Sequence, residues 1–201
     1  MNNKAMFNIT YGLYVLTAKD DVKDNGCLIN TAGQVTTSPN RITLAVNKLN
    51  LTHDMMLKTG TFNISTLSQD APFSVFQKFG MTSGKTVDKF ADFSDVYRSE
   101  NGLLYLTKYA NSFISGKVVT ATDVGRHTLF LADVADAEIL SETESMSYAF
   151  YHKNVKPSTP RPAVKGWRCR VCGYVYECDE LPPDFICPVC KHGAADFERI
   201  E

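Results

Sequence analysis

Two cysteine pairs in the last quarter of the chain constrain its fold more than any other feature. Cys169 and Cys172 form one Cys-x-x-Cys turn, and Cys187 and Cys190 form a second. A turn of this kind points two thiolates to one side of a metal ion, so two facing turns complete a tetrahedral site with four sulfur ligands. The segment is therefore expected to fold around one metal ion.

The residues around the cysteines favour iron, although four thiolates accept zinc equally well. Aromatic and aliphatic side chains can form a dry shell around the sulfur atoms, and such a shell tunes a redox centre by limiting water. A zinc ribbon remains an alternative. A disulfide knot does not fit a chain without an export signal. The expected shell residues are Trp167, Tyr174, Tyr176, Phe185, Ile186 and Phe197.

The other two cysteines, Cys27 and Cys178, have no partner at ligand spacing and are expected to be ordinary thiols. The chain shows no apolar h-region near its start and no run of about 18 apolar residues, so neither secretion nor membrane spanning is expected. The sequence therefore predicts a cytoplasmic protein.

Charge is distributed unevenly along the chain. The formal net charge of −1 argues against a nucleic-acid partner. Residues 166–201 carry four Lys or Arg against seven Asp or Glu, and a four-thiolate iron would add further negative charge. This end of the chain is expected to dock on basic surfaces, at rates that depend on salt.

A proline-rich stretch separates two domains. Residues 153–165 hold three of the eight prolines and show no apolar periodicity, which indicates a semi-extended linker. The predicted domains are residues 1–152 and 166–201. The second is small enough to need its metal for stability, and the tether would hold it near the first at high effective concentration.

The first domain has mainly the periodicity of strands, which predicts a β-barrel. Short helices are expected at 52–59, ending at Gly60, and at 70–80; the capping-box spacing of Ser141 and Glu144 predicts a third helix after it. The segments with alternating apolar residues are 13–18, 41–46, 61–67, 103–109, 113–119 and 128–140.

A polar stretch, residues 30–39, is the candidate cofactor turn. With Asn47, Lys48, Thr52 and His53 it supplies hydroxyls, amides and a cation, the donors that a phosphate and a polar flavin edge require. No Gly-x-Gly-x-x-Gly is present, so a Rossmann site is not expected. From composition alone, a polar hairpin with local Asn and Thr turns is the better explanation of the stretch.

The end of the chain resembles rubredoxin, the one-iron electron carrier. The resemblance rests on Trp167-Arg-Cys-Arg-Val-Cys-Gly-Tyr-Val-Tyr, on Pro-Asp-Phe-Ile-Cys-Pro-Val-Cys190 and on Asp196-Phe-Glu. Only 14 residues separate the cysteine pairs, from Gly173 to Ile186. This spacing is similar to the abbreviated rubredoxin domains at the end of rubrerythrin-type proteins.

The first domain resembles the flavin reductase family of FMN-binding split barrels, which implies a homodimer with FMN in a cleft reached by a reduced nicotinamide. Together with its tail, the chain resembles the high-molecular-weight rubredoxins, which pass electrons from NAD(P)H to flavodiiron proteins. The segments that carry the resemblance are 11–18, 27–39, 45–53, 60–67, 88–90 and 148–152.

The resemblance implies roles for individual residues. Asn30, Thr31 and Ala32 would line the flavin ring, while Lys85 and Lys89 would complete the phosphate pocket, unless they only form a solvated basic loop. His53 is equally explained as a cap or packing residue. His127, His152 and His192 have no ligand spacing and receive no role. The residues expected at the ribityl or phosphate end are Thr36, Thr37, Ser38, Asn47, Lys48, Thr52 and His53.

The expected function is an NAD(P)H-dependent oxidoreductase. A nicotinamide delivers two electrons as a hydride, the iron takes one, and FMN converts between the two modes. No catalytic acid, base or nucleophile is needed, and none is predicted. The expected acceptor is a flavodiiron oxygen or nitric oxide reductase. A free-flavin or ferric reductase with an accessory metal domain, and a non-enzymatic zinc-ribbon binding module, remain alternatives.

Overall fold

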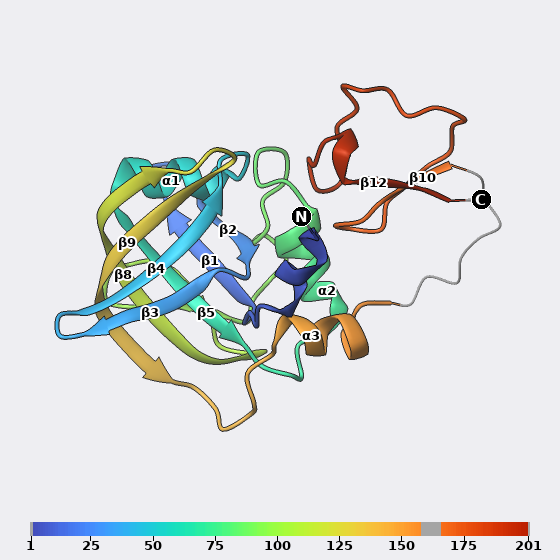
Figure 1. The fold of residues 1–201 in the computed structure, drawn as a ribbon. Coiled ribbons are helices and arrows are strands. Elements are labelled where there is room, and N and C mark those ends of the chain that lie inside the picture. Colours follow the sequence, from blue (N-terminus) through green and yellow to red (C-terminus); the bar gives the residue numbers. More distant parts are fainter. Residues whose placement is uncertain (1, 158–165, 201) are drawn as a thin grey trace.

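The computed structural model describes residues 2–157 and 166–200, which form a large β domain and a small domain (Figure 1). The strands are β1 (Tyr14–Lys19), β2 (Asp24–Ile29), β3 (Ala32–Thr37), β4 (Asn40–Asn47), β5 (Thr61–Leu67), β6 (Val96–Arg98), β7 (Leu104–Leu106), β8 (Ala110–Asp123), β9 (His127–Ile139), β10 (Gly166–Cys169), β11 (Val175–Tyr176) and β12 (Phe197–Ile200). The helices are η1 (Asn3–Asn8), α1 (Leu51–Thr59), α2 (Phe73–Phe76), η2 (Gln77–Met81), α3 (Tyr148–Phe150), η3 (Tyr151–Val155) and η4 (Ala194–Asp196).

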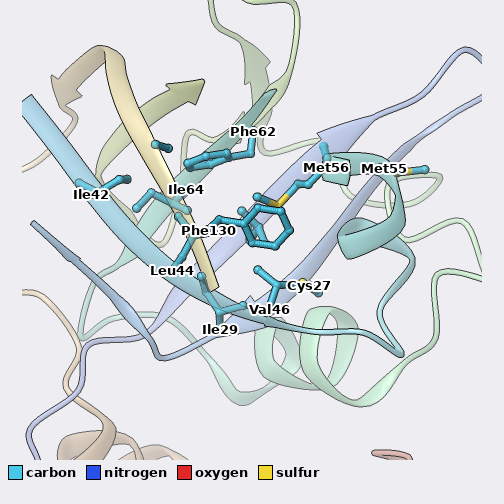
Figure 2. Packing of buried hydrophobic residues seen from close by; sticks show 13 residues of the cluster. Cys27, Ile29, Ile42, Leu44, Val46, Met55, Met56, Phe62, Ile64 and Phe130 are labelled. Atoms are coloured by element: carbon cyan, nitrogen blue, oxygen red, sulfur yellow. The ribbon is translucent and has the colours of Figure 1, made fainter. Parts of the chain in front are cut away.

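Seven antiparallel strands of the large domain form one curled sheet in the order β2-β1-β5-β8-β9-β4-β3. Strands near both ends of this order contribute to one buried interior, with Cys27 and Ile29 from β2 and Leu44 from β4 (Figure 2). The pairing of β8 with β9 shifts register twice, and such irregularities let long strands bend. The predicted mainly β barrel-like fold is confirmed.

Strand β1 is buried on both sides of the sheet. Neighbouring residues of a strand point to opposite faces, and Val15 and Leu16 are both 0% exposed. Leu16 packs into the barrel interior, whereas Val15 packs against the helices outside it. All six predicted strand segments contain strands. The periodicity missed β2 and β3, because both carry polar residues or glycine where an alternating pattern needs apolar ones.

Helix α1 closes one end of the barrel and ends as predicted. Gly60 follows it with a φ of 69°, a left-handed conformation that favours glycine, and its N–H donates to the Met56 carbonyl at 2.9 Å. Met55 and Met56 pack into the interior (Figure 2). Helices α2 and η2 together occupy the second predicted helical segment.

The third helix begins later than the capping-box spacing predicts. It starts at Tyr148, where the Ser147 hydroxyl accepts a hydrogen bond from the Phe150 N–H at 3.1 Å. Asn111 holds the earlier residues outside a helix, because its backbone carbonyl accepts from the Ser141 N–H and its side-chain amide donates to the Thr143 carbonyl. A helix does follow this stretch, but its N-cap is Ser147 and not Ser141.

The helices pack against the outside of the sheet through a second apolar cluster. Phe76 and Tyr151 lie with ring centroids 4.3 Å apart, and Phe79 is 1% exposed beside them. Helix η3 runs to Val155, which packs against this cluster, so the helix includes the first residues of the predicted linker. Residues 158–165 of that linker lie outside the described residues.

The small domain is a three-stranded antiparallel sheet in the order β11-β10-β12. Its buried centre consists of Cys169, Cys187 and Phe197, surrounded by partly buried aromatic rings. The rings of Tyr176 and Phe185 stack with centroids 4.4 Å apart. Most of the expected shell is therefore present, but Ile186 is 60% exposed and does not belong to it.

Candidate functional site

The two cysteine turns have equivalent backbone hydrogen bonds. In the first turn the Gly173 N–H donates to the Cys169 carbonyl at 2.8 Å, and in the second the Lys191 N–H donates to the Cys187 carbonyl at 2.9 Å. Gly173 and Lys191 both have positive φ, 81° and 61°. Each turn thus closes in the same way and presents its two sulfur atoms on one side.

The four sulfur atoms converge as the spacing predicts. All lie within 4.8 Å of one another, and two pairs, Cys169 with Cys190 and Cys172 with Cys187, are 3.5 Å apart. A disulfide would hold its sulfurs about 2.05 Å apart. A tetrahedron with metal–sulfur bonds of about 2.3 Å has edges of roughly 3.8 Å. The donor set therefore fits one tetrahedral ion and no disulfide.

The thiols also differ in their acidity. A hydrogen bond from the Cys190 thiol is the main cause that lowers the pKa of Cys172 to about 5, and the same interaction raises the pKa of Cys190. Burial raises the pKa of Cys169. Four ionised sulfurs at this spacing repel one another, so complete deprotonation needs a bound cation.

Two of the four cysteines, Cys172 and Cys190, face a cavity that is shared with the barrel. This cavity, about 300 Å³ in volume, is lined from the small domain by Val171, Cys172, Cys190 and His192. From the large domain it is lined by Leu13, Cys27, Leu28, Ile29, Asn30, Asn47, Asn50, Phe76, Phe79, Gly80, Met81, His127, Tyr148 and Tyr151. We call it the central cavity. Its volume falls within the range of small-molecule sites.

A smaller cavity adjoins the central one. Its volume is about 50 Å³, and it shares Cys27, Asn47 and Cys190 with the central cavity. Lys89 also lines it, and this buried ammonium donates to the backbone carbonyls of Gly26 at 2.8 Å and Phe79 at 3.1 Å. Burial lowers the pKa of Lys89 to about 8.

The structure brings some of the predicted flavin residues together. Asn30 and Asn47 line the central cavity, and Asn47 and Lys89 line the smaller one. The Thr31 hydroxyl instead donates to the Ala45 carbonyl at 2.8 Å, and Ala32 lines a separate cavity of about 380 Å³. Contact of these residues with FMN stays a prediction.

Thr36, Thr37 and Ser38 lie far from this group, at the tip of the β3–β4 hairpin. Thr37 pairs with Asn40 at one end of β4, while Asn47 stands at the other end. Seven residues of strand separate them by roughly 23 Å. None of the three hairpin residues lines the central cavity.

The remaining predicted contacts already have partners within the barrel. Thr52 accepts a hydrogen bond from the Asn25 amide at 2.8 Å, and the Nε2 atom of buried His53 lies 2.9 Å from the Thr128 hydroxyl. Lys48 pairs with Asp123 at 2.6 Å, and Lys85 lies 3.6 Å from Asp54. A phosphate near either lysine would compete with these carboxylates.

Sequence reasoning missed several residues of the central cavity. His127 and His192 received no role, yet both line it. Burial, and then the neighbouring charge of His192, lowers the pKa of His127. Phe79 and Tyr151 contribute apolar walls. No local spacing marks these residues, because the fold of the large domain brings Phe79, Tyr151 and His127 together, and only domain packing adds His192.

Beside the central cavity, an ion pair joins the two domains. Arg126, which precedes β9, lies 3.3 Å from Asp196 of η4. The pair connects a basic residue of the large domain with an acidic residue of the small domain. In residues 2–157 and 166–200, no helix is long and apolar enough to cross a membrane.

The fold and the four-sulfur site define a flavin-reductase-type barrel joined to a rubredoxin-type metal domain. Residues 6–159 match the family model described as Flavin reductase like domain, and residues 167–198 match the model described as Rubrerythrin, rubredoxin-like domain. These matches and the converging cysteines support a flavin site and an iron site. The chain is an oxidoreductase.

Relatives that match most or all of the chain define its family more closely. A protein of Moorella thermoacetica named High molecular weight rubredoxin is 34% identical, and the match covers 100% of both chains. A ferric-chelate reductase (NAD(P)H) of Archaeoglobus fulgidus is 36% identical over 82% of this chain and 96% of its own. The chain belongs to the flavin reductase family, in the two-domain form of the high-molecular-weight rubredoxins.

Solved structures agree on the fold of the large domain. The NADH:FAD oxidoreductase of Streptomyces globisporus C-1027 superposes with a TM-score of 0.65 at 22% identity, covering 72% of this chain and 84% of that one. At this identity the likeness concerns the fold alone.

Proposed function

We propose that the chain takes electrons from NAD(P)H onto FMN, passes them singly to the four-thiolate iron and delivers them to an acceptor protein of the flavodiiron oxygen or nitric oxide reductase type. One observation carries this proposal. The central cavity is lined both by predicted flavin residues, Asn30 and Asn47, and by two of the four metal ligands, Cys172 and Cys190.

The cofactors would supply the redox chemistry, in which a flavin converts a two-electron hydride input into single electrons and the iron carries one electron. The protein positions them. Asn30 and Asn47 offer amide groups to a polar ring edge, while Phe79 and Tyr151 form apolar walls. Because the flavin and the iron would border the same cavity, electrons would travel a short distance between them, and this step would need no encounter with a separate protein.

The four ligands are unequal in exposure, which indicates where electrons enter and leave the small domain. Cys169 and Cys187 are 1% and 0% exposed, whereas Cys172 and Cys190 are partly exposed and face the central cavity. The sulfur atoms of Cys172 and Cys190 therefore form the electron-transfer edge of the domain. An acceptor protein would have to reach this edge, or the nearby turn residues, after the small domain leaves the barrel.

An anaerobic rapid-mixing experiment tests the proposal. NADH or NADPH is mixed with protein loaded with FMN and iron, and the flavin and iron absorption bands are followed separately. Both bands should bleach, the flavin first. A Cys172→Ser variant should lose the iron band and keep flavin reduction, while Cys178→Ser serves as a control because Cys178 lies outside the sulfur cluster. An iron band that never bleaches during turnover would refute the proposed order.

A second function is supported by the Archaeoglobus fulgidus ferric-chelate reductase, whose match covers 82% of this chain. In that case the barrel would reduce a ferric chelate or free flavin directly. Cys172→Ser should then keep the full rate of ferric-chelate reduction, whereas in the proposed function it loses transfer to an acceptor protein. Colourless native protein with one zinc per chain would instead favour a binding module.

The family resemblance also implies a homodimer, and sedimentation velocity on loaded protein tests that part of the proposal. The cytoplasmic location stays a prediction from the sequence, which cell fractionation tests.

A further inference from the structure

A further cavity lies between the large domain and the first cysteine turn. Its volume is about 500 Å³, and it is lined by Asn8, Ile9, Thr10, Tyr11, Tyr148, Ala149, His152 and Arg170. We call it the outer cavity. Among the described residues of the small domain, Arg170 alone lines it, and Tyr148 lines both this cavity and the central one. A long ligand that crosses Tyr148 could therefore occupy both.

The walls of the outer cavity suit a flat aromatic ring. The rings of Tyr11 and Tyr148 meet edge to face with centroids 6.4 Å apart, and those of Tyr148 and His152 lie 4.5 Å apart at an interplanar angle of 68°. Rings held in this way leave faces on which a base can stack. Ile9 and Ala149 add apolar surface.

The charge of the outer cavity suits a phosphate. None of its described lining residues is acidic, and Arg170 is exposed. One guanidinium N–H of Arg170 donates to the Ala195 carbonyl at 2.6 Å, which fixes the side chain while other N–H groups remain for a ligand. Burial lowers the pKa of His152, and the charge of Lys156 lowers it further. The guanidinium of Arg170 is therefore the side chain of this lining that stays positively charged.

We infer that the outer cavity binds the adenosine phosphate half of NAD(P)H, with Arg170 of the iron domain contacting a phosphate and the base stacking on one of the two perpendicular rings of Tyr11 and Tyr148 while its edge meets the other. This inference rests on the proposed function, in which NAD(P)H reduces FMN at the central cavity, and it places the nicotinamide half there. Because Arg170 belongs to the small domain, nucleotide binding and docking of the iron domain favour each other. The reduced nucleotide thus selects the arrangement in which the metal ligands face the flavin site.

The test compares Arg170→Ala with Arg199→Ala, which removes the same charge from the exposed side of β12 in the same domain. Calorimetry with ADP-ribose measures binding to the adenosine half alone. Anaerobic flavin reduction is then measured with NADH and with reduced nicotinamide mononucleotide, which lacks the adenosine phosphate. The iron absorption band of each variant reports whether the small domain is folded.

Loss of the Arg170 contact should weaken ADP-ribose binding and raise the KM for NADH on the order of tenfold, with no change for the mononucleotide and none in Arg199→Ala. Equal ADP-ribose affinity in Arg170→Ala and the unchanged protein would overturn the inference. So would equal changes for NADH and the mononucleotide. If neither nucleotide reduced the flavin while ADP-ribose still bound through Arg170, the proposed function would fail and the adenosine site would stand.

The adenosine half of FAD has the same chemistry and is tested separately. Apoprotein affinity for FAD should equal that for FMN in both variants. A preference for FAD that disappears in Arg170→Ala would assign the cavity to the flavin and overturn the inference for NAD(P)H.

Discussion

The two domains of this chain hold their sites in opposite ways. In the small domain, two of the three buried central residues are the metal ligands Cys169 and Cys187, so the core and the site are one structure. In the barrel, the interior cluster consists of packed apolar side chains and the Cys27 thiol (Figure 2), and the central cavity only borders this cluster, through Cys27 and Ile29. Removing the metal should therefore unfold the small domain, whereas the barrel should stay folded without its flavin.

Metal removal should have the largest effect. Binding of a structural four-ligand metal is worth on the order of 10 kcal/mol in small domains, which is folding free energy. Chelation under reducing conditions, or Cys187→Ser, should unfold residues 166–200 and expose Trp167. This residue is the chain's single tryptophan, so its emission reports on the small domain alone. We expect a red shift in emission, with the thermal transition of the barrel unchanged.

The matched control for this experiment is Cys178→Ser. Cys178 belongs to the same domain but not to the four-sulfur cluster, so its loss should leave the emission of Trp167 unchanged. If the barrel transition moved together with the tryptophan signal, the two domains would be a single cooperative unit, and the contrast between them would be lost.

The complementary experiment removes a large apolar side chain from the barrel interior. Phe130 is 0% exposed at the centre of the interior cluster, and its ring contacts that of His53 at 5.9 Å between centroids. Phe130→Ala should lower the free energy of unfolding of the barrel by about 3–5 kcal/mol, measured by circular dichroism in denaturant. The iron absorption should persist at denaturant concentrations that unfold the barrel. Leu129→Ala, on the outer face and 38% exposed, should have a much smaller effect.

The same contrast explains how far the sequence alone could predict this protein. The convergence of the four cysteines was predictable, because they are grouped in two turns whose spacing already encodes their geometry. The barrel was predictable as a class, because the strands with regular alternation dominate it. Strand β2 was not, since Asp24, Asn25 and Gly26 break the pattern at its start.

The lining of the central cavity was only partly predictable, and the reason is the strand topology. Thr37 and Asn47 lie close in sequence, but antiparallel pairing of β3 with β4 places them at opposite ends of β4. Conversely, His127 and His192 are distant in sequence and meet at the central cavity. Domain packing creates that neighbourhood, and no spacing motif records it.

A smaller effect concerns the buried Lys89, which lines the smaller cavity beside the central one. Burial lowers the pKa of its ammonium from 10.5 to about 8. Between pH 8 and 10.5 the unfolded chain keeps a proton that the folded barrel has lost, so the free energy of unfolding rises with pH across this window. Below pH 8 both states are protonated and this contribution is constant. We expect a rise on the order of 2 kcal/mol.

Denaturant titrations of unloaded protein and Lys89→Met at several pH values measure this rise as a difference. Burial raises the pKa of the nearby Cys27 thiol. Above the usual pKa of a thiol, this shift makes the free energy of unfolding fall with pH, opposite to the effect of Lys89, so only the difference between the two proteins isolates Lys89. A phosphate bound beside Lys89 would restore the ammonium and flatten the profile in FMN-loaded protein. An unchanged slope on loading would argue against Lys89 as a phosphate contact.

The smallest expected effect lies at the contact between the domains. Arg126 and Asp196 are 58% and 29% exposed, and such pairs contribute no more than about 1 kcal/mol. Arg126→Ala should therefore leave the stability of each domain unchanged. Its effect should appear in the rate at which the iron band bleaches after NADH is added, because the docked population of the small domain falls.

A double-mutant cycle with Asp196→Asn isolates the pair. The two single variants and the double variant should slow the iron signal equally, and added salt should slow the unchanged protein toward the same rate, since screening weakens exposed charge pairs. Flavin bleaching should not change in any of them. Additive effects would mean that each residue acts separately, and the small domain would then be held against the barrel by the walls of the central cavity rather than by charge.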